Sequence, residues 1–337
     1  MEITKAKIYP KLFESLFIIV LLLLGGFHVF SSDGSIAENS QIKTSLISWA
    51  MNLKFIVLKD NFYSNLMYTS NQSWLSYTGE LSIDDSQNSI PFSDAELAKI
   101  HAKLLDLNQN LSSRDIKFYL VIPPNKNTIY PDDLDRIAPK RSTKSRLDQL
   151  IEYERLHSGV DVIDIRPELL GAKKTHQVFF ATDTHWNDYG SWVAYTNIIN
   201  AISKDFLNIV ANPIGYFNIG ESTYSGDLAK KGGNLMIKET TQTYSLQNPR
   251  NVKHENLVLD NGVRVIRSYI DDPELPVALI FRDSFYTNLH KYMSQHFSNT
   301  VSLWSFVFDY DQVDKVKPDL VIVEISERYI NQLLKLP

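Results

Sequence analysis

The 337-residue chain is predicted to form an α/β fold in which helices cover both faces of a mostly parallel sheet. Two observations predict this class. Short, almost continuous hydrophobic runs alternate with longer segments whose hydrophobic residues recur at helical spacing. Hydrophobic residues also make up 44% of the chain, which is enough for a large core. The chain has no cysteine, which excludes disulfides, thiol catalysis and cysteine-ligated zinc.

The elements can be predicted in chain order. Ser93 and Glu96 have the spacing of a capping box, and leucine and isoleucine residues follow at helical spacing up to Leu111. Hydrophobic runs predict the strands Phe118–Ile122, Val160–Ile165, Val277–Phe281, Val301–Phe306 and Leu320–Ile325. Further helices are expected near residues 142–157, 188–205 and 286–297, and from Arg328 onward.

The alternation of strands and helices predicts one large domain at residues 70–337. Within it, residues 207–275 are rich in glycine, asparagine and threonine, so we expect an irregular or β-rich insertion there. Residues 33–69 are typical of a polar tether that joins this domain to the N-terminal segment.

The N-terminus has a basic-then-hydrophobic pattern. Lysines up to Lys11 precede the hydrophobic run Leu16–Phe30. This order directs the N-terminus to the cytoplasm and the following chain outward. We therefore expect residues 1–32 to be a cytoplasmic stub and a signal anchor, with a single membrane pass and the domain on the periplasmic or cell-surface side. The alternatives are a cleaved signal peptide, with a weak site at Ser35–Ala37, and a buried core helix.

The charge balance argues against a nucleic-acid partner. The net charge is −5, and the one basic cluster, Lys140–Arg146, is short. Aromatic residues make up 12% of the chain, and any exposed ones would suit stacking on sugar rings. A polysaccharide substrate is compatible with this composition.

Two distant segments supply the groups that activate a serine. Asp183 and His185 lie before a predicted helix, and Ser284 follows the predicted strand Val277–Phe281. A histidine takes a proton near neutral pH and a carboxylate orients its ring, which makes a serine hydroxyl nucleophilic. Loops at the carboxyl ends of parallel strands form the usual ligand site. We therefore predict Ser284 as nucleophile, His185 as base and Asp183 as orienting acid; a surface pair and a helix cap are the non-catalytic interpretations.

The same segments carry a family resemblance. Asp183–Asn187 resembles the Asp-x-His-Trp signature of the alginate O-acetyltransferase family of AlgJ and AlgX type, whose members are SGNH-hydrolase-like enzymes. Phe281–Phe285 is similar to the nucleophile segment of that family. Weaker similarities occur in the same order at Trp74–Asn88, Ile122–Pro131, Gly226–Ala229 and Val323–Tyr329. The resemblance covers about residues 70–330 and implies an SGNH-hydrolase-like fold with a permuted order, in which the serine comes last.

One residue departs from the expected nucleophile motif, because Arg282 stands where such motifs often carry glycine. Its guanidinium is a candidate for substrate contact. The backbone N–H groups from Ser284 into the next helix are expected to stabilise an oxyanion. Other candidates for substrate contact are Trp186, Asn187, Asn125 and Lys126.

The resemblance implies an O-acetyltransferase that acetylates an extracytoplasmic polysaccharide through an acyl-serine. It also implies a membrane-bound O-acyltransferase as the partner that delivers the acetyl group. No cofactor is expected, because the sequence has neither a P-loop nor a glycine-rich dinucleotide turn. No metal is expected, because Asp183 and His185 lack an evident third ligand and Lys173 and Lys174 flank His176. The alternatives are a carbohydrate esterase with the same triad and a non-catalytic polysaccharide-binding or assembly subunit.

Overall fold

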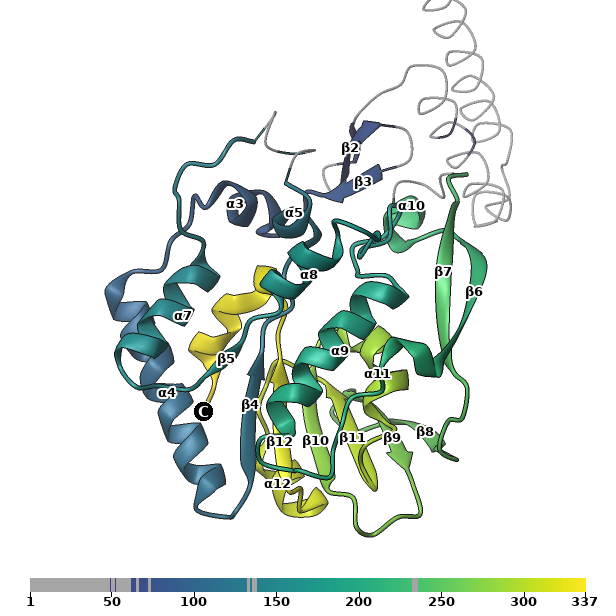
Figure 1. The fold of residues 1–337 in the computed structure, drawn as a ribbon. Coiled ribbons are helices and arrows are strands. Elements are labelled where there is room, and N and C mark those ends of the chain that lie inside the picture. The colour runs from purple at the N-terminus through teal and green to yellow at the C-terminus, as the bar shows by residue number, and fades with distance from the viewer. Residues whose placement is uncertain are drawn as a thin grey trace, which may run out of the picture.

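The structure is a computed structural model that describes residues 49, 52, 62–64, 67–71, 74–131, 134, 138–231 and 236–337. Within these residues, the centre is a seven-stranded sheet of order β5-β4-β12-β10-β11-β9-β8 (Figure 1). The strands from β5 to β11 in this order are parallel, and β9 and β8 continue the sheet in antiparallel fashion. Their bounds are β4 (Lys117–Val121), β5 (Val162–Ile163), β8 (Lys253–Val258), β9 (Arg264–Tyr269), β10 (Val277–Arg282), β11 (Asn299–Trp304) and β12 (Leu320–Glu324).

Strand β10 shows why the central strands are hydrophobic throughout. Ala278 and Ile280 belong to the core on one face of the sheet, whereas Leu279 and Phe281 belong to the core on the other. Side chains alternate between the two faces along a strand, so a strand that is covered on both sides has no position for a polar residue. The predicted α/β fold with a mostly parallel sheet is therefore confirmed.

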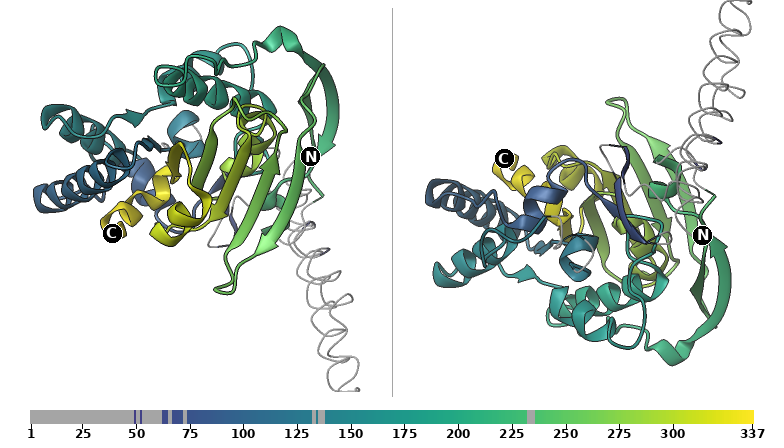
Figure 2. Two further views of the ribbon diagram at one scale, coloured as in Figure 1. Left: turned by 90° about the horizontal axis from the view of Figure 1, so that it is seen from below. Right: turned by 90° about the horizontal axis from the view of Figure 1, so that it is seen from above.

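Helices cover both faces of the sheet, as Figure 2 shows in two further views. One layer contains α8 (Arg166–Ala172), α9 (Asp188–Ile202) and α11 (Tyr286–Met293). The other contains α4 (Asp94–Ser112), α7 (Arg146–Leu156), α12 (Tyr310–Val316) and the 3-10 helix η3 (Glu327–Lys335).

Local signals in the sequence set several of these boundaries. The predicted capping box is present at α4, where Ser93 Oγ accepts from Glu96 N and Ser93 N donates to Glu96 Oε2. Two elements differ from expectation. The predicted strand at residues 160–165 is only the two-residue β5, because this edge strand pairs with just two residues of β4. The predicted C-terminal helix is the 3-10 helix η3.

The segment 207–275 contributes more to the fold than the insertion predicted from its composition. It contains the 3-10 helix η2 (Ile214–Tyr216), the hairpin β6 (Phe217–Tyr224) and β7 (Glu239–Leu246), and the short helix α10 (Asp227–Lys231). It also supplies β8 and β9, which are part of the central sheet. Figure 1 shows the β6–β7 hairpin standing beside α9. The hairpin supplies residues that contact the candidate site, as described below.

A small antiparallel sheet precedes the main domain. It consists of β1 (Phe62–Ser64), β2 (Met67–Asn71) and β3 (Trp74–Tyr77), and the short helices α3 (Ser82–Gln87) and α5 (Lys126–Ile129) lie nearby (Figure 1). The predicted signal anchor at residues 1–32 lies outside the described residues. In the described part of the chain, no helix combines the length and hydrophobicity that a bilayer crossing requires.

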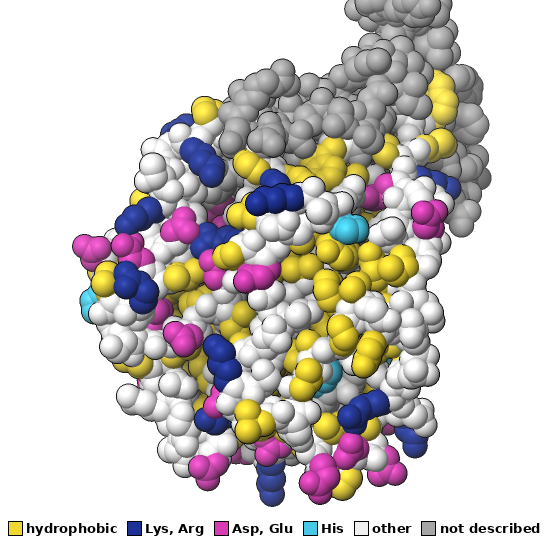
Figure 3. Space-filling view, viewed as in Figure 1, with side chains coloured by type: hydrophobic (Ala, Val, Ile, Leu, Met, Phe, Trp, Pro, Cys, Tyr) yellow, Lys and Arg dark blue, Asp and Glu magenta, His cyan; other side chains and the backbone are white. Residues whose placement is uncertain are grey.

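The face seen in Figure 3 carries no large region of a single charge sign. Lys and Arg side chains are interspersed with Asp and Glu side chains, and hydrophobic side chains gather around α9 (Figure 3). This face therefore carries no stripe of positive charge.

Candidate active site

Two loops meet because the helices that follow them pack side by side. The Asp183–His185 loop leads into α9, and the turn that contains Ser284 leads from β10 into α11. Both helices cover the same face of the sheet, and they lie together in Figures 1 and 2. Their N-termini therefore bring residues about a hundred positions apart in sequence to one edge of the sheet.

Asp183, His185 and Ser284 form a continuous hydrogen-bonded chain. His185 Nε2 lies 2.8 Å from Ser284 Oγ, and His185 Nδ1 lies 2.6 Å from Asp183 Oδ1. The His185 side chain is 18% exposed and that of Asp183 is 4% exposed. A substrate can therefore reach the hydroxyl and the imidazole, whereas the carboxylate is shielded from water.

The buried carboxylate of Asp183 accepts hydrogen bonds at both oxygens. Oδ1 accepts from the His185 backbone as well as from the His185 ring, and Oδ2 accepts from Tyr224 Oη at 2.6 Å and from Asp227 N at 2.9 Å. Burial alone would raise the pKa of Asp183, but the imidazole and these donors hold it well below its usual range. The acid therefore stays ionised and keeps the His185 ring oriented.

Replacing Tyr224 with phenylalanine is expected to slow catalysis about tenfold, because the ionised acid loses one charge-assisted hydrogen bond. The Michaelis constant should stay close to that of the wild type, since Tyr224 contacts the acid and not the nucleophile. Steady-state kinetics on a chromogenic acetate ester provides the measurement. Tyr216→Phe, which removes the same atom from an exposed side chain, is the matched control. Equal rates for both variants would show that this hydrogen bond is unimportant.

The approach of α10 to the acid requires a glycine. A Cβ atom placed on Gly226 would lie 2.3 Å from Thr182 O and 2.6 Å from Asp183 Cβ. Both distances are shorter than real contacts of a Cβ atom, so any side chain here would push the acid away. Gly226 thus allows the Asp227 N–H to reach the carboxylate.

Two charged side chains, the buried Lys126 and the partly buried Glu239, hold the rest of the loop. Lys126 Nζ donates to the carbonyl oxygens of Leu75, Ala181 and Asp183 at 2.7, 2.9 and 3.1 Å. Glu239 of β7 accepts from the N–H groups of Ala181 and Thr182, each at 2.8 Å. The loop that carries the acid is therefore bound on both sides, which fixes its position relative to Ser284.

The turn that contains Ser284 is organised by a second buried aspartate. Asp283 Oδ1 accepts from Phe285 N at 2.8 Å, and Asp283 Oδ2 accepts from Ser326 N at 2.9 Å. The N–H of Asp283 itself donates to Glu324, whose pKa is raised well above its usual range by burial and by Asp283. Because Phe285 N is already bound, the helix start does not offer it to an oxyanion, contrary to expectation. The N–H of Ser284 remains the backbone donor at this turn.

Two of the residues expected to contact substrate serve the scaffold instead. Trp186 is fully buried, its ring meets Phe285 edge-on, and its Nε1 donates to Phe285 O at 3.2 Å. It has no surface left for a sugar. Asn187 caps α9 through Gly190 N and donates to Gln177 O. These placements correct the expectation that the two side chains bind substrate.

Three further candidates are also buried. Arg282 is 2% exposed, donates to Asp283 O and stacks over Trp304. Asn125 is 3% exposed, and its backbone N–H donates to Glu327 Oε2 at 2.8 Å. Lys126 is 4% exposed and holds the acid loop as described above. The side chains of Arg282 and Lys126 thus make contacts within the scaffold, and the expected contact of the three side chains with substrate stays a prediction.

The structure adds a third potential metal ligand that the sequence pattern did not reveal. One donor atom each of Asp183, His185 and Asp227 lies within 4.8 Å of the others. However, Asp183 already accepts hydrogen bonds at both oxygens, Asp227 accepts from Thr184 N, and Lys231 Nζ lies 3.1 Å from Asp227 Oδ2. The carboxylate oxygens of Asp183 and Asp227 thus already accept hydrogen bonds or pair with the ammonium group of Lys231. This arrangement favours proton transfer by these residues over metal binding.

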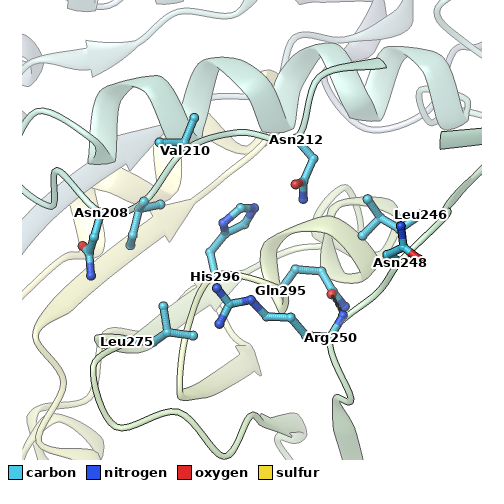
Figure 4. Close-up of a pocket in the computed structure, with 10 residues that line it drawn as sticks. Asn208, Val210, Asn212, Leu246, Asn248, Arg250, Leu275, Gln295 and His296 are labelled. Carbon is cyan, nitrogen blue, oxygen red and sulfur yellow. Dashed lines mark hydrogen bonds between the residues drawn. The ribbon is translucent and has the colours of Figure 1, made fainter. Parts of the chain in front are cut away.

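A separate cavity of about 170 Å³ lies at the far end of α11, away from the triad (Figure 4). His296 and Gln295 point into it from the end of the helix, and Asn212, Asn248 and Arg250 line other sides. None of the three triad residues lines this cavity.

Comparison with known families decides the relationship. The sequence profile of the family described as an SGNH hydrolase-like domain, acetyltransferase AlgX, matches residues 69–306. The chain belongs to this family. The predicted resemblance is therefore confirmed, and the domain is an alginate O-acetyltransferase-like SGNH-type domain.

Curated relatives of this AlgX-type domain agree with the assignment. The probable alginate O-acetylase AlgJ of Pseudomonas aeruginosa is 28% identical over 36% of this chain and 31% of the relative. The protein of the same name from Pseudomonas putida is 25% identical over 68% of this chain and 62% of the relative. The chain thus matches less than two thirds of the length of either relative.

Solved structures show the same fold. Bacillus cereus PatB1 superimposes with a TM-score of 0.60 at 15% identity, over 80% of this chain and 99% of PatB1, and it has also been solved with a sulfonyl adduct. AlgX of Pseudomonas aeruginosa gives a TM-score of 0.52 at 15% identity, over 79% of this chain and 62% of AlgX. At this identity, the likeness extends to the fold alone.

Several residues that support the site of the AlgX-type domain were not predicted. Tyr224 and Glu239 lie in the segment predicted to be an irregular or β-rich insertion, and nothing in their local pattern points to a distant acid. Asp227 lies in the noted block Gly226–Ala229, and the glycine before it was the available signal.

Proposed function

We propose that this domain transfers acetyl groups to hydroxyl groups of an extracytoplasmic polysaccharide through an acyl-enzyme on Ser284. The proposal rests chiefly on the hydrogen-bonded chain from Asp183 through His185 to Ser284. Membership of the AlgX-type acetyltransferase family and the alginate O-acetylase names of the relatives support the choice of acyl group and acceptor.

In the first half of the reaction, Ser284 Oγ attacks the acetyl carbonyl carbon while His185 Nε2 takes its proton. The ionised Asp183 stabilises the imidazolium, and the N–H of Ser284 donates to the oxyanion. When the tetrahedral intermediate collapses, the imidazolium gives its proton to the leaving group. The acetyl group is then an ester of Ser284.

In the second half, a sugar hydroxyl takes the place of the leaving group. His185 accepts the proton of this hydroxyl as its oxygen attacks the ester, and returns a proton to Ser284 Oγ when the enzyme is released. If water attacked the ester in place of the sugar hydroxyl, the acetyl group would be lost by hydrolysis. Transfer therefore requires that a sugar hydroxyl binds beside Ser284 in preference to water.

We further propose that residues 1–32 anchor the protein in the cell membrane with the domain on the outer side, as a membrane-bound O-acyltransferase partner would require. The lysine-flanked hydrophobic run supports this arrangement. An alkaline phosphatase fused after residue 337 is expected to be active, and an inactive fusion that is fully expressed would overturn the orientation.

The catalytic proposal is tested by covalent labelling and by acetyl transfer in parallel. Phenylmethylsulfonyl fluoride should modify Ser284, as peptide mass spectrometry would show, and the label should be absent from the His185→Ala variant. With 4-nitrophenyl acetate as donor, alginate oligosaccharides should become acetylated and should increase the release of 4-nitrophenol.

The outcomes separate the alternatives. Labelling of Ser284 with ester hydrolysis but no acetylated sugar, for alginate and for neutral oligosaccharides alike, would identify an esterase. A folded protein that is neither labelled nor active would be a binding or assembly subunit.

A further inference from the structure

We propose a zinc site outside the active site, formed by His254 of β8, His290 of α11 and Ser268 of β9. The three donor atoms converge on one point at the edge of the sheet. His254 Nδ1 lies 3.4 Å from His290 Nε2, and Ser268 Oγ lies 2.9 Å from the first and 3.1 Å from the second.

The spacing of the two nitrogens is that of ligands on one ion. Zinc binds imidazole nitrogen at about 2.0–2.1 Å in tetrahedral geometry, which places two such nitrogens about 3.3–3.4 Å apart. The observed 3.4 Å agrees with this value. Ser268 Oγ is slightly closer, so it becomes the third ligand after a small outward shift, and solvent completes the shell on the side of the exposed His254.

Without metal, the cluster forms a hydrogen-bonded relay in which His290 donates to Ser268 and Ser268 donates to His254. Zinc would replace these two hydrogen bonds with bonds to the same three atoms. Among the described residues, Nδ1 of His290 is buried without a hydrogen-bond partner, so the hydrogen bonds of this ring are those of the cluster.

The charges around the cluster set the expected affinity. Burial, His254 and Arg282 lower the pKa of His290 to about 4, so its imidazole is neutral at physiological pH and offers a lone pair. The same Arg282 guanidinium opposes a bound cation. With two imidazoles and one hydroxyl in place of four strong ligands, we expect binding on the order of micromolar, weaker than in structural zinc sites.

An ion at this position would join the sheet edge to the nucleophile helix. Strand β8 is one of the two edge strands of the sheet, whereas α11 begins two residues after Ser284. His290 lies in the second turn of that helix. Zinc would therefore tie the helix that carries the nucleophile turn to β8 and β9, without entering the active site.

The test is a zinc titration of the full chain, prepared without a polyhistidine tag and stripped with a chelator. Calorimetry should show one site, which His254→Ala weakens by at least roughly tenfold. Because His254 is exposed, this variant should keep the melting temperature of the metal-free wild type. Bound Co²⁺ should show the visible bands of a tetrahedral site in the wild type and lose them in His254→Ala.

Two controls make the assignment specific. His176→Ala removes an exposed histidine elsewhere and should bind zinc as the wild type does. His185→Ala removes the candidate ligand in the active site and should also retain the zinc site. Loss of binding in His185→Ala but not in His254→Ala would overturn the proposal, as would the absence of binding to the wild type at millimolar zinc.

Discussion

Replacing Ser284 with alanine is expected to reduce acetyl transfer by at least about a thousandfold, because the acyl-enzyme has no other atom on which to form. The fold should survive, since the change removes one oxygen at a partly exposed position and leaves the bonds of Asp283 intact. Transfer of acetyl from 4-nitrophenyl acetate to oligosaccharide measures the first effect, and thermal unfolding measures the second.

Ser203→Ala, at the end of α9, provides the matched control and should leave the rate of transfer unchanged. A Ser284→Ala variant that acetylates sugar at the wild-type rate would exclude the proposed mechanism. A loss of activity accompanied by unfolding would not distinguish chemistry from structure, so Ser284→Cys, which restores a nucleophile of similar size, should then be measured for acyl-enzyme formation by mass spectrometry.

Lys126→Met is expected to lower the free energy of unfolding by about 3 kcal/mol or more, because three buried carbonyl oxygens lose a charged donor. Methionine retains much of the volume of the lysine side chain. The decrease in the free energy of unfolding is therefore attributed to the lost polar contacts. Acetyl transfer should fall as well, because one of these carbonyls belongs to Asp183. Denaturant unfolding and initial rates provide the two measurements.

Lys99→Met, on the exposed side of α4, should change stability by less than about 0.5 kcal/mol. If both lysine variants unfold at the same denaturant concentration, the buried ammonium does not hold the loop. If Lys126→Met is destabilised but fully active, the loop keeps its position without this residue.

The sequence was sufficient to predict the layers of the fold, and it pointed to three distant residues that the structure joins by hydrogen bonds. Strands that are buried on both faces appear in the sequence as continuous hydrophobic runs. The start of α4 is marked by the capping box of Ser93 and Glu96. Asp183, His185 and Ser284 were recognisable for two reasons. Each lies in a short motif at a strand or helix boundary, and together they supply the acid, the base and the hydroxyl that serine catalysis needs.

The surroundings of the triad were not predictable in the same way. Trp186 and Arg282 occur beside the motif residues, and from sequence such neighbours look like substrate contacts. Only the packing shows that their side chains turn into the core. Tyr224 contacts an acid 41 residues away in sequence. No periodicity or spacing encodes such a pairing, which arises from the path of the chain between β6 and α10.

The double attachment of Asp183 Oδ2 to Tyr224 and Asp227 has a mechanical consequence. The last residue of one hairpin strand and the first residue of α10 hold the same oxygen, so the hairpin and the carboxylate cannot shift independently. A displacement of β6 is therefore expected to move Asp183 with it, and through Asp183 the His185 ring that faces Ser284.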